Sequence, residues 1–395
     1  MTLSKLVVFG VLFLVALGAI VATFFLRAPV VKADQVAEEI IAACKTDPKS
    51  GGDQCYEKRV PDLYPDMPMR AVFDVIREIR HKDPSYQFCH VLAHKLGERI
   101  VAEDPSRWIE VMSMNPEDGL CSNGFIHGII VGRFRDDVLD DERLRSVIPD
   151  FARACEPRAD WQPTPLDQAI CYHGMGHLYM FITNADYERS LETCDATTQS
   201  ATGNFMRVCR EGVFMQTYQP LEPDDFALIE LLPEKPGVEN YRRICAQFPR
   251  DEDEGACLRE AWPLFRESLF EPGGAAQFCS GQPNEDEKDA CYDSVFAIVG
   301  RQSLSDADKA VRVCSTVPSE EKLKCFSSVA GAILEEDRAS GQGAIDFCER
   351  AGEELSPRCL RVLADRARFV FGDTPYRTSF CALLPDDLAE RCTTP

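Results

Sequence analysis

Residues 310–325 read AVRVCSTVPSEEKLKC, and this stretch contains the signals of a helix, a break and a second helix. The apolar residues before Cys314 are spaced as on one face of a helix. Pro318 ends that helix, because proline lacks the backbone N–H and clashes with the preceding turn. Two glutamates follow, and acidic side chains suit the positive amino end of a helix that begins near Cys325. The stretch therefore predicts a helical hairpin.

The same pattern recurs at a fixed period in the carboxyl-terminal part of the chain. Each unit has two cysteines close together in sequence, namely Cys245 with Cys257, Cys279 with Cys291, Cys314 with Cys325, Cys348 with Cys359 and Cys381 with Cys392. A proline or glycine follows the first cysteine of each unit by four positions, at Pro249, Pro283, Pro318, Gly352 and Pro385. A fixed period of about 34 residues is typical of stacked supersecondary units.

The eighteen cysteines are even in number and patterned in spacing, which predicts disulfides. We expect nine sequential bridges and no free thiol, the remaining pairs being Cys44 with Cys55, Cys89 with Cys121, Cys155 with Cys171 and Cys194 with Cys209. A bridge that closes a loop of about 12 residues contributes roughly 3 kcal/mol in the chain-entropy model. A zinc cluster is not expected, since no C-x2-C pair is present.

With this cysteine-marked period, the chain resembles the TPR and Sel1-like superfamily of helical-hairpin repeats, especially secreted versions with one disulfide per repeat. The resemblance covers residues 35–395 and is architectural, because the usual TPR consensus is absent and the cysteine spacing is wider than in Sel1-like repeats. It implies an all-α fold, a right-handed αα superhelix or solenoid of about ten hairpins with a concave binding face.

Composition and compartment narrow the functional classes. A net charge of −22 argues against nucleic-acid binding, which needs clustered Lys and Arg. No phosphate-binding glycine motif is present, so no nucleotide is expected. Disulfides persist outside the cytoplasm, so we expect an extracytoplasmic protein, periplasmic or at the cell surface.

The amino-terminal segment predicts attachment to a membrane. Residues Leu6 to Leu26 carry no charge. An apolar run of roughly 20 residues is long enough to span a bilayer as a helix. A cleaved signal sequence is the alternative, because residues 31–33 offer a weak cleavage site. We therefore expect an anchor or signal over residues 1–33, histidine-rich repeats over 34–239 and regular cysteine-stapled repeats over 240–395.

Two insertions interrupt the period and flank one block of repeats. Successive cysteines that open a helix keep close to the common period, except for two longer intervals, from Cys121 to Cys171 and from Cys209 to Cys257. The extra residues fall in 134–150 and 219–239, and insertions in a solenoid usually form loops. We expect the chemistry of the protein in the block that they flank.

Five of the six histidines lie in that block and share a register. The aligned motifs are FCHVLAH at 88–94, CSNGFIH at 121–127, CYHGMGH at 171–177 and CREGVFM at 209–215. Positions three and seven hold His90, His94, Asn123, His127, His173, His177, Glu211 and Met215. Residues four apart lie on one face of a helix, so two histidines can chelate one ion. The alternative is that these are core histidines with satisfied hydrogen bonds.

A glycine follows position three in three motifs, at Gly124, Gly174 and Gly212. Each costs about 1 kcal/mol relative to alanine inside a helix, so a reason for the glycine is required. Either the helices pack closely there, or a metal complex or substrate approaches where a Cβ would interfere.

These side chains predict a transition-metal centre. We expect His90, His94, His173 and His177 as ligands, with His127 and Glu211 completing one crowded site or a two-metal site, and with Asn123 and Met215 as further candidates. Imidazole and carboxylate suit zinc, iron or copper, whereas calcium and magnesium prefer oxygen. Haem between two histidines is less favoured, and C-x-x-C-H is absent.

Two functions follow from such a centre. The first is a metal-dependent enzyme, redox or hydrolytic, in which Glu211 acts as the general base. The second is a membrane-tethered scaffold or metal-carrying protein without catalysis, whose carboxyl-terminal repeats bind a protein partner.

Overall fold

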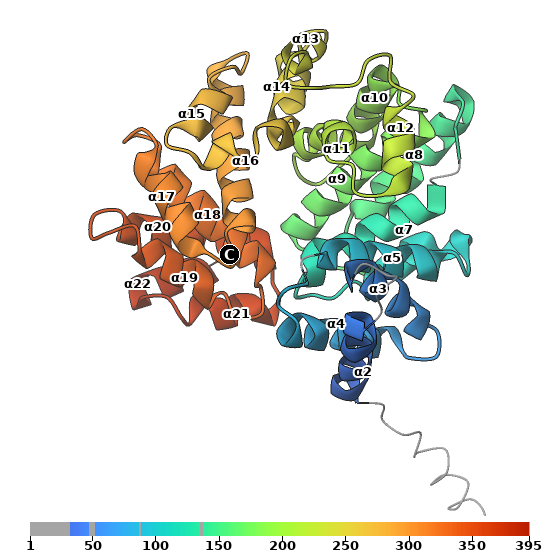
Figure 1. Cartoon of the computed structure of the whole chain (residues 1–395), viewed down its shortest axis with the longest axis horizontal. Helices are drawn as coiled ribbons and strands as arrows, with labels where there is room; N and C mark the ends of the chain where they lie inside the picture. Colours follow the sequence, from blue (N-terminus) through green and yellow to red (C-terminus); the bar gives the residue numbers. More distant parts are fainter. Residues whose placement is uncertain (1–31, 47–51, 87, 135–136, 395) are drawn as a thin grey trace, which may run out of the picture.

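The computed structural model describes residues 32–46, 52–86, 88–134 and 137–394, and over these residues the protein is all-α (Figure 1). The described residues form helices α2 to α22 without a β-strand, and the one isolated β-bridge joins Arg158 and Trp161. The predicted all-α class is therefore confirmed for the described residues.

The predicted membrane segment at residues 6–26 lies outside the residues that the structure describes. Among the helices described, none combines the length and the apolar character needed to cross a membrane.

The first half of the described chain contains eleven α-helices, which include all five clustered histidines. They are α2 (Ala33–Thr46), α3 (Gly52–Arg59), α4 (Met69–Lys82), α5 (Cys89–Val101), α6 (Trp108–Val111), α7 (Gly124–Phe134), α8 (Asp141–Cys155), α9 (Pro165–Ile182), α10 (Tyr187–Thr198), α11 (Met206–Tyr218) and α12 (Pro223–Ile229).

The second half contains the regular units, in which a short helix alternates with a longer one. They are α13 (Tyr241–Cys245), α14 (Asp251–Glu260), α15 (Gly274–Cys279), α16 (Glu285–Gln302), α17 (Ala307–Thr316), α18 (Lys322–Glu336), α19 (Gln342–Glu349), α20 (Ser356–Phe371), α21 (Pro375–Cys381) and α22 (Asp386–Thr393).

All nine predicted disulfides are present, and no cysteine is free. Their Cα–Cα distances run from 5.1 to 5.8 Å, which is the ordinary range for such a bridge. The bridges join Cys44 with Cys55, Cys89 with Cys121, Cys155 with Cys171, Cys194 with Cys209, Cys245 with Cys257, Cys279 with Cys291, Cys314 with Cys325, Cys348 with Cys359 and Cys381 with Cys392.

Most bridges join consecutive helices. Cys245 ends α13, for example, and its partner Cys257 lies inside α14. The result is a repeat-like, all-helical architecture, and the number of bridges suggests an oxidising, extracytoplasmic environment.

The second helix of a unit begins earlier than the cysteine spacing predicts. Helix α14 begins at Asp251, six residues before Cys257, and α16 begins at Glu285 under an amino-terminal cap from Asn284. The prediction that the second cysteine of a pair opens the helix was therefore wrong. That cysteine lies inside the helix, as shown by Cys55 in α3, Cys171 in α9, Cys291 in α16 and Cys359 in α20.

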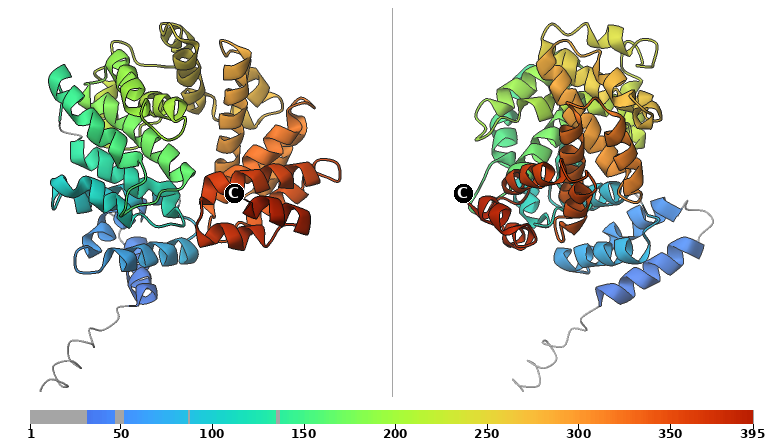
Figure 2. Two further views of the ribbon diagram at one scale, coloured as in Figure 1. Left: turned by 180° about the vertical axis from the view of Figure 1, so that it is seen from behind. Right: turned by 90° about the vertical axis from the view of Figure 1, so that its left-hand side faces the viewer.

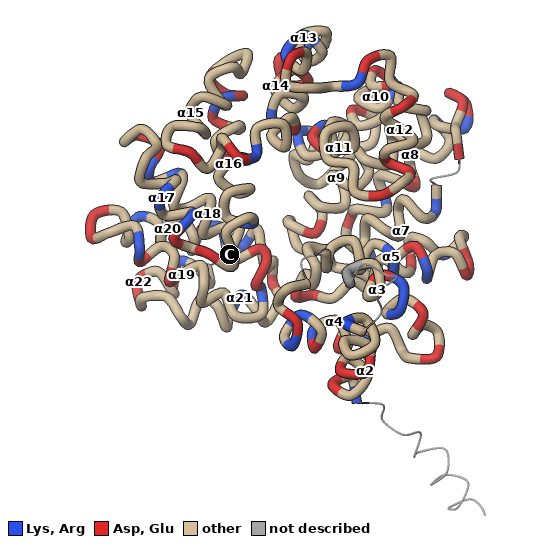
Figure 3. Tube along the Cα trace, in the orientation of Figure 1, with Lys and Arg blue, Asp and Glu red and all other residues tan. Residues whose placement is uncertain are grey.

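The acidic residues form the first turn of the second helix in α14, α16 and α22, whereas they precede the helix at α18 and α20. Figure 3 marks in red the acidic residues at the start of α14 and α16, the end of the helix where its dipole is positive. The favourable charge at this end explains why these helices start before the cysteine.

The insertions are partly helical, so the prediction of plain loops was wrong. Residues 141–150 of the first insertion belong to α8, and the second insertion contains α12. Pro223 stands in the first turn of α12, where its missing N–H would have no helical partner in any case.

The described chain has two hydrophobic clusters, one over residues 37–261 and one that joins Leu166 to residues 269–392. The carboxyl-terminal helices turn back toward the histidine block, as both views of Figure 2 show. Arg338 donates to Asp167 at the start of α9 across 2.8 Å, and both side chains are buried. The predicted domain boundary at 239/240 stays a prediction.

Candidate metal centre

Three of the four aligned motifs lie on helices α5, α9 and α11, but the motif at 121–127 begins differently. Cys121, Ser122 and Asn123 form a left-handed turn with φ of 56°, 52° and 56°, and α7 begins only at Gly124. Asn123 donates to Asp167 across 3.0 Å and accepts from the side chain of Asn115 across 2.7 Å. The expectation of a helical position three was therefore wrong at Asn123, whose amide is engaged away from the histidines.

The repeated glycines allow two helix pairs, α5 with α7 and α9 with α11, to pack closely. A Cβ on Gly124 would lie 2.3 Å from the carbonyl oxygen of His90, and one on Gly212 would lie 2.1 Å from that of His173. Gly174 differs, because its Cβ would lie 2.5 Å from the ring of His127. Close helix packing thus explains two glycines, and the third makes room for an imidazole.

The five histidines of the block gather into one cluster with His127 at its centre. The ring of His127 lies 5.3 Å from His90, 5.9 Å from His94, 6.0 Å from His173 and 5.7 Å from His177, measured between centroids. Three helices supply these rings, since α5, α7 and α9 pack side by side. The convergence that the sequence predicted is present.

Three of these rings form the tightest group, which we call the three-histidine site: His90, His94 and His127. One nitrogen from each lies within 4.8 Å of the others. Nδ1 of His90 lies 3.2 Å from the carbonyl oxygen of Cys121, and Nε2 of His127 lies 2.9 Å from that of Ile170. A carbonyl only accepts, so each of these nitrogens carries the proton and the other keeps its lone pair. Metal-binding histidines are oriented in this way.

Two carboxylates also lie close to His94. Nδ1 of His94 lies 3.6 Å from Glu222 and 3.9 Å from Glu98, and one atom from each of the three residues falls within 4.8 Å of the others. Glu222 also accepts from Lys95 across 2.7 Å. The sequence interpretation missed both carboxylates. Glu98 could have been found four residues after His94, and Glu222 lies in the second insertion.

Burial controls the protonation of the cluster. It lowers the pKa of His90 to about 3 and the pKa of His127 and His177 well below the ordinary value, and the neighbouring histidines add to the shift. Burial also lowers the pKa of His94, but Glu222 and Glu98 outweigh it, and the net shift is upward.

The pKa of Glu222 shifts in the opposite direction to that of His94. Burial raises it, but the hydrogen bond and charge of His94 and the contact with Lys95 outweigh burial and hold the pKa at about 2. Glu222 is therefore ionised at neutral pH, whereas His90, His127 and His177 are neutral imidazoles, the form that binds a metal.

A cavity of about 50 Å³ adjoins the cluster. His90, His94, His127 and His177 line it, together with Met215 and Glu222. This volume admits an ion with a few small ligands, since one water needs only about 10 to 15 Å³ of such space.

The remaining predicted residues lie on α9 and α11. Nε2 of His173 lies 3.0 Å from Sδ of Met215, and Nδ1 of His177 lies 2.8 Å from Oε1 of Gln216. Burial lowers the pKa of His173, an effect that the charge of Glu211 opposes.

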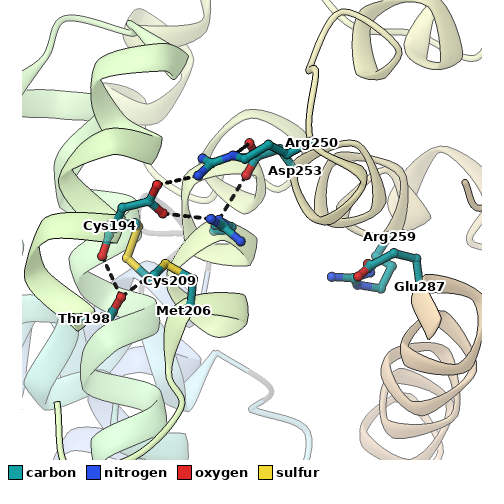
Figure 4. A network of polar contacts seen from close by, with 10 residues as sticks. Cys194, Thr198, Met206, Cys209, Arg250, Asp253, Arg259 and Glu287 are labelled. Carbon is teal, nitrogen blue, oxygen red and sulfur yellow. Dashed lines mark hydrogen bonds and ion pairs between the residues drawn. A yellow bond between two sulfur atoms is a disulfide. The ribbon is translucent and has the colours of Figure 1, made fainter. Parts of the chain in front are cut away.

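Glu211 is engaged in a buried ion-pair network. Its carboxylate accepts from Arg259 across 2.9 Å, and Arg259, which is 1% exposed, also pairs with Glu287. Figure 4 shows Arg259 and Glu287 side by side. Glu211 belongs to neither group of close metal donors among the described residues. The structure therefore places Glu222, and not Glu211, in a close donor group with a histidine.

Comparison of the chain with family models, curated proteins and solved structures finds no match.

Proposed function

We propose that the chain is an extracytoplasmic metalloprotein that binds a transition-metal ion through His90, His94 and His127. The observation that carries the proposal is the set of three imidazole nitrogens within 4.8 Å of one another, two of the rings being oriented by backbone carbonyls. A buried core histidine needs hydrogen-bond partners, whereas these three rings line a shared cavity large enough for an ion.

The carboxylates support the same proposal. Glu222 and Glu98 face Nδ1 of His94, which is the carboxylate–histidine arrangement that orients a ligand and raises its basicity. Three imidazoles with nearby carboxylates suit zinc, iron or copper. When bound, such an ion supplies Lewis-acid or redox chemistry.

The enzyme hypothesis rests on the cavity. Three protein ligands leave a coordination position for a small substrate, as in catalytic metal sites. Glu222 then replaces Glu211 as the carboxylate beside that position, because Glu222 lines the cavity whereas Glu211 pairs with Arg259 outside its lining.

A metal-carrying or scaffold protein without catalysis is the second candidate. The size of the cavity, about 50 Å³, favours it, because a macrocycle such as haem or a large substrate does not fit. In this proposal the repeats stack as a right-handed superhelix of the TPR or Sel1-like type, and the carboxyl-terminal units bind a protein partner. Residues 6–26 tether the chain to the membrane in either case.

The test is elemental analysis of the full chain, exported to an oxidising compartment and purified without a histidine tag. We expect a stoichiometric transition metal that is lost in the triple variant His90→Gln, His94→Gln, His127→Gln. The matched control is His81→Gln, which changes the sixth histidine, an exposed residue of α4. Helical content measured by circular dichroism should be equal in all three proteins. A triple variant that keeps the full metal content of the wild type, or a wild type that takes up no metal on reconstitution, would refute the proposal.

A further inference from the structure

The contact between His173 and Met215 joins two atoms that both lack a hydrogen. Nδ1 of His173 lies 3.1 Å from the carbonyl oxygen of Val208 and must donate to it, so Nε2 keeps its lone pair. This nitrogen lies 3.0 Å from the thioether sulfur of Met215, which has no proton to give. Burial lowers the pKa of His173, which keeps a second proton off the ring. Two lone pairs therefore face each other.

His177, whose ring lies beside that of His173, has a third buried lone pair. Its Nδ1 lies 2.8 Å from Oε1 of Gln216, and the amide of Gln216 is oriented by its own donation to Asp225 across 2.6 Å. Nδ1 of His177 therefore carries the proton. Its Nε2 is buried without a hydrogen-bond partner among the described residues. The rings of His173 and His177 lie 4.8 Å apart on one face of α9.

A cation explains these three atoms together. Buried lone pairs without a donor are costly, because each has given up hydrogen bonds to water. Packing of sulfur against an imidazole edge would account for the contact of Met215 with His173, but it leaves Nε2 of His177 without a partner. A metal ion accepts electron density from all three.

We propose that His173, His177 and Met215 form a second metal site, selective for a soft monovalent ion, namely cuprous copper. The proposal deepens the proposed function, on which it rests, by naming a metal class for the far side of the same cluster. We call these three residues the methionine site. Thioether sulfur is a soft ligand that prefers cuprous copper over zinc or ferrous iron, and imidazole accepts that ion as well.

The sequence register supports the division into two sites. Position seven of the aligned motifs is His94, His127 and His177 in three cases and Met215 in the fourth. Close packing of α9 and α11 brings that methionine to His173, since a Cβ on Gly176 would lie 2.0 Å from the carbonyl oxygen of Cys209. The only soft ligand at position seven of the four motifs is therefore Met215, in the last motif along the chain.

The charge around the two sites also differs, and this difference favours a divalent ion at one site and a monovalent ion at the other. The three-histidine site has Glu98 and Glu222 beside His94, which favours a divalent ion. The methionine site has three neutral donors, and the carboxylate of Glu211 on α11 is paired with Arg259. A neutral donor set surrounded by low-dielectric protein favours the ion of lower charge.

Silver ion is the probe for the methionine site, because it shares the softness of cuprous copper and needs no reductant that would attack the disulfides. The full chain, stripped of metal, is titrated with silver nitrate in chloride-free buffer by calorimetry. We expect one site whose affinity falls about 10- to 100-fold or more in Met215→Leu. The matched control is Met175→Leu, the same exchange at a buried methionine of α9, and it should leave the affinity unchanged.

Zinc titration of the same proteins separates this proposal from the proposed function. Met215→Leu should keep zinc binding, and the triple variant of the three-histidine site should lose zinc but keep silver. Nitrogen-15 chemical shifts of Nε2 in His173 and His177 should move on silver binding and not on zinc binding. Equal silver affinity in Met215→Leu and Met175→Leu, or unmoved shifts at both nitrogens, would overturn the methionine site. A wild type that binds silver but no zinc would refute only the three-histidine site.

Discussion

Glu222 has a larger effect on the candidate centre than any other single carboxylate. It lies 3.6 Å from His94, outweighs the effect of burial on the pKa of that histidine, and remains ionised because Lys95 and His94 share its charge. Its position depends on a hydrogen bond from its own backbone N–H to Asp225, across 2.8 Å at the start of α12.

We predict that Glu222→Gln weakens metal binding. The amide carries no charge, so the pKa of His94 should fall and its basicity as a ligand should decrease, with a loss of about 10- to 100-fold in zinc affinity. The measurement is competition against a chromophoric chelator. Glu230→Gln, which removes an exposed carboxylate paired with Lys235, is the control and should bind zinc like the wild type. Equal affinities in the two variants would show that Glu222 does not orient His94.

The buried neutral histidines predict that the metal-free protein loses stability in acid. His127 has a pKa well below the ordinary value of about 6.5 that it regains on unfolding, so between these limits only the unfolded chain binds the proton. Its contribution is therefore fully present above about pH 6.5 and is lost as the pH falls, by about 1.4 kcal/mol per pH unit. His94, whose pKa is raised, acts in the opposite sense.

The measurement is urea unfolding at pH 7 and pH 5 with metal removed. The wild type should lose stability between these values, and His127→Gln should lose about 2 kcal/mol less, because the titrating ring is gone. Far-ultraviolet circular dichroism at pH 7 serves as the control for folding. Parallel pH profiles of the two proteins would contradict the assignment of a neutral His127.

At the scale of helices, the site depends on pairs that touch through their backbones. Helices α9 and α11 approach closely at Gly212, and α5 and α7 approach closely at Gly124. This close approach brings histidines from different helices together. Helix spacing in such contacts is set by the side chains at the crossing point, and glycine allows the smallest distance.

We predict that Gly212→Ala destabilises the fold and weakens silver binding together. The new Cβ would lie 2.1 Å from the carbonyl oxygen of His173, so α9 and α11 must separate, at a cost of about 1–3 kcal/mol that exceeds the gain of about 1 kcal/mol in helix propensity. Gly343→Ala in α19 is the control, because its Cβ would meet only Ile333 at 3.4 Å. That variant should be as stable as the wild type in thermal unfolding, or more so. Unchanged stability and silver affinity in Gly212→Ala would show that the helices need no close approach.

At the scale of the whole molecule, long-range contacts return the carboxyl-terminal repeats to the histidine block. Arg338 pairs with Asp167 from a distant part of the sequence, and Ser122 donates to Glu336 across 2.7 Å. Asp167 also accepts from Asn123, so the same carboxylate joins α9, the left-handed turn before α7 and the end of α18.

We predict that Arg338→Ala destabilises the protein by about 3–5 kcal/mol, because it leaves Asp167 buried without its cation. Arg312→Ala is the control. It removes an exposed arginine 3.9 Å from Asp306, and such surface pairs contribute about 0–1 kcal/mol. The measurement is denaturant unfolding of both variants. Equal stability would show that the return contact is not required by the fold.

The sequence alone predicted the features that depend on neighbours in the chain. Pro318 and its counterparts end helices wherever they occur, and Cys314 bonds to Cys325 because so short a hairpin leaves few other partners within reach. The all-α class and the nine bridges follow from this local pattern of cysteines and helix-breaking residues. The register of five histidines follows from the same cysteine positions. Each of these inferences needed only the period of a helix and the position of its breaks.

The tertiary structure decided which carboxylates lie next to His94. Glu211 has the correct position in the motif, but it forms an ion pair with Arg259 of the next unit. Glu222 lies in the second insertion, far along the chain from His94, and contacts that histidine. Asn123 likewise has the correct position in the motif but lies in a left-handed turn. A pattern of spacing fixes only the face of a helix on which a side chain lies. Its partner depends on which helices pack against that face, and those contacts join residues far apart in sequence.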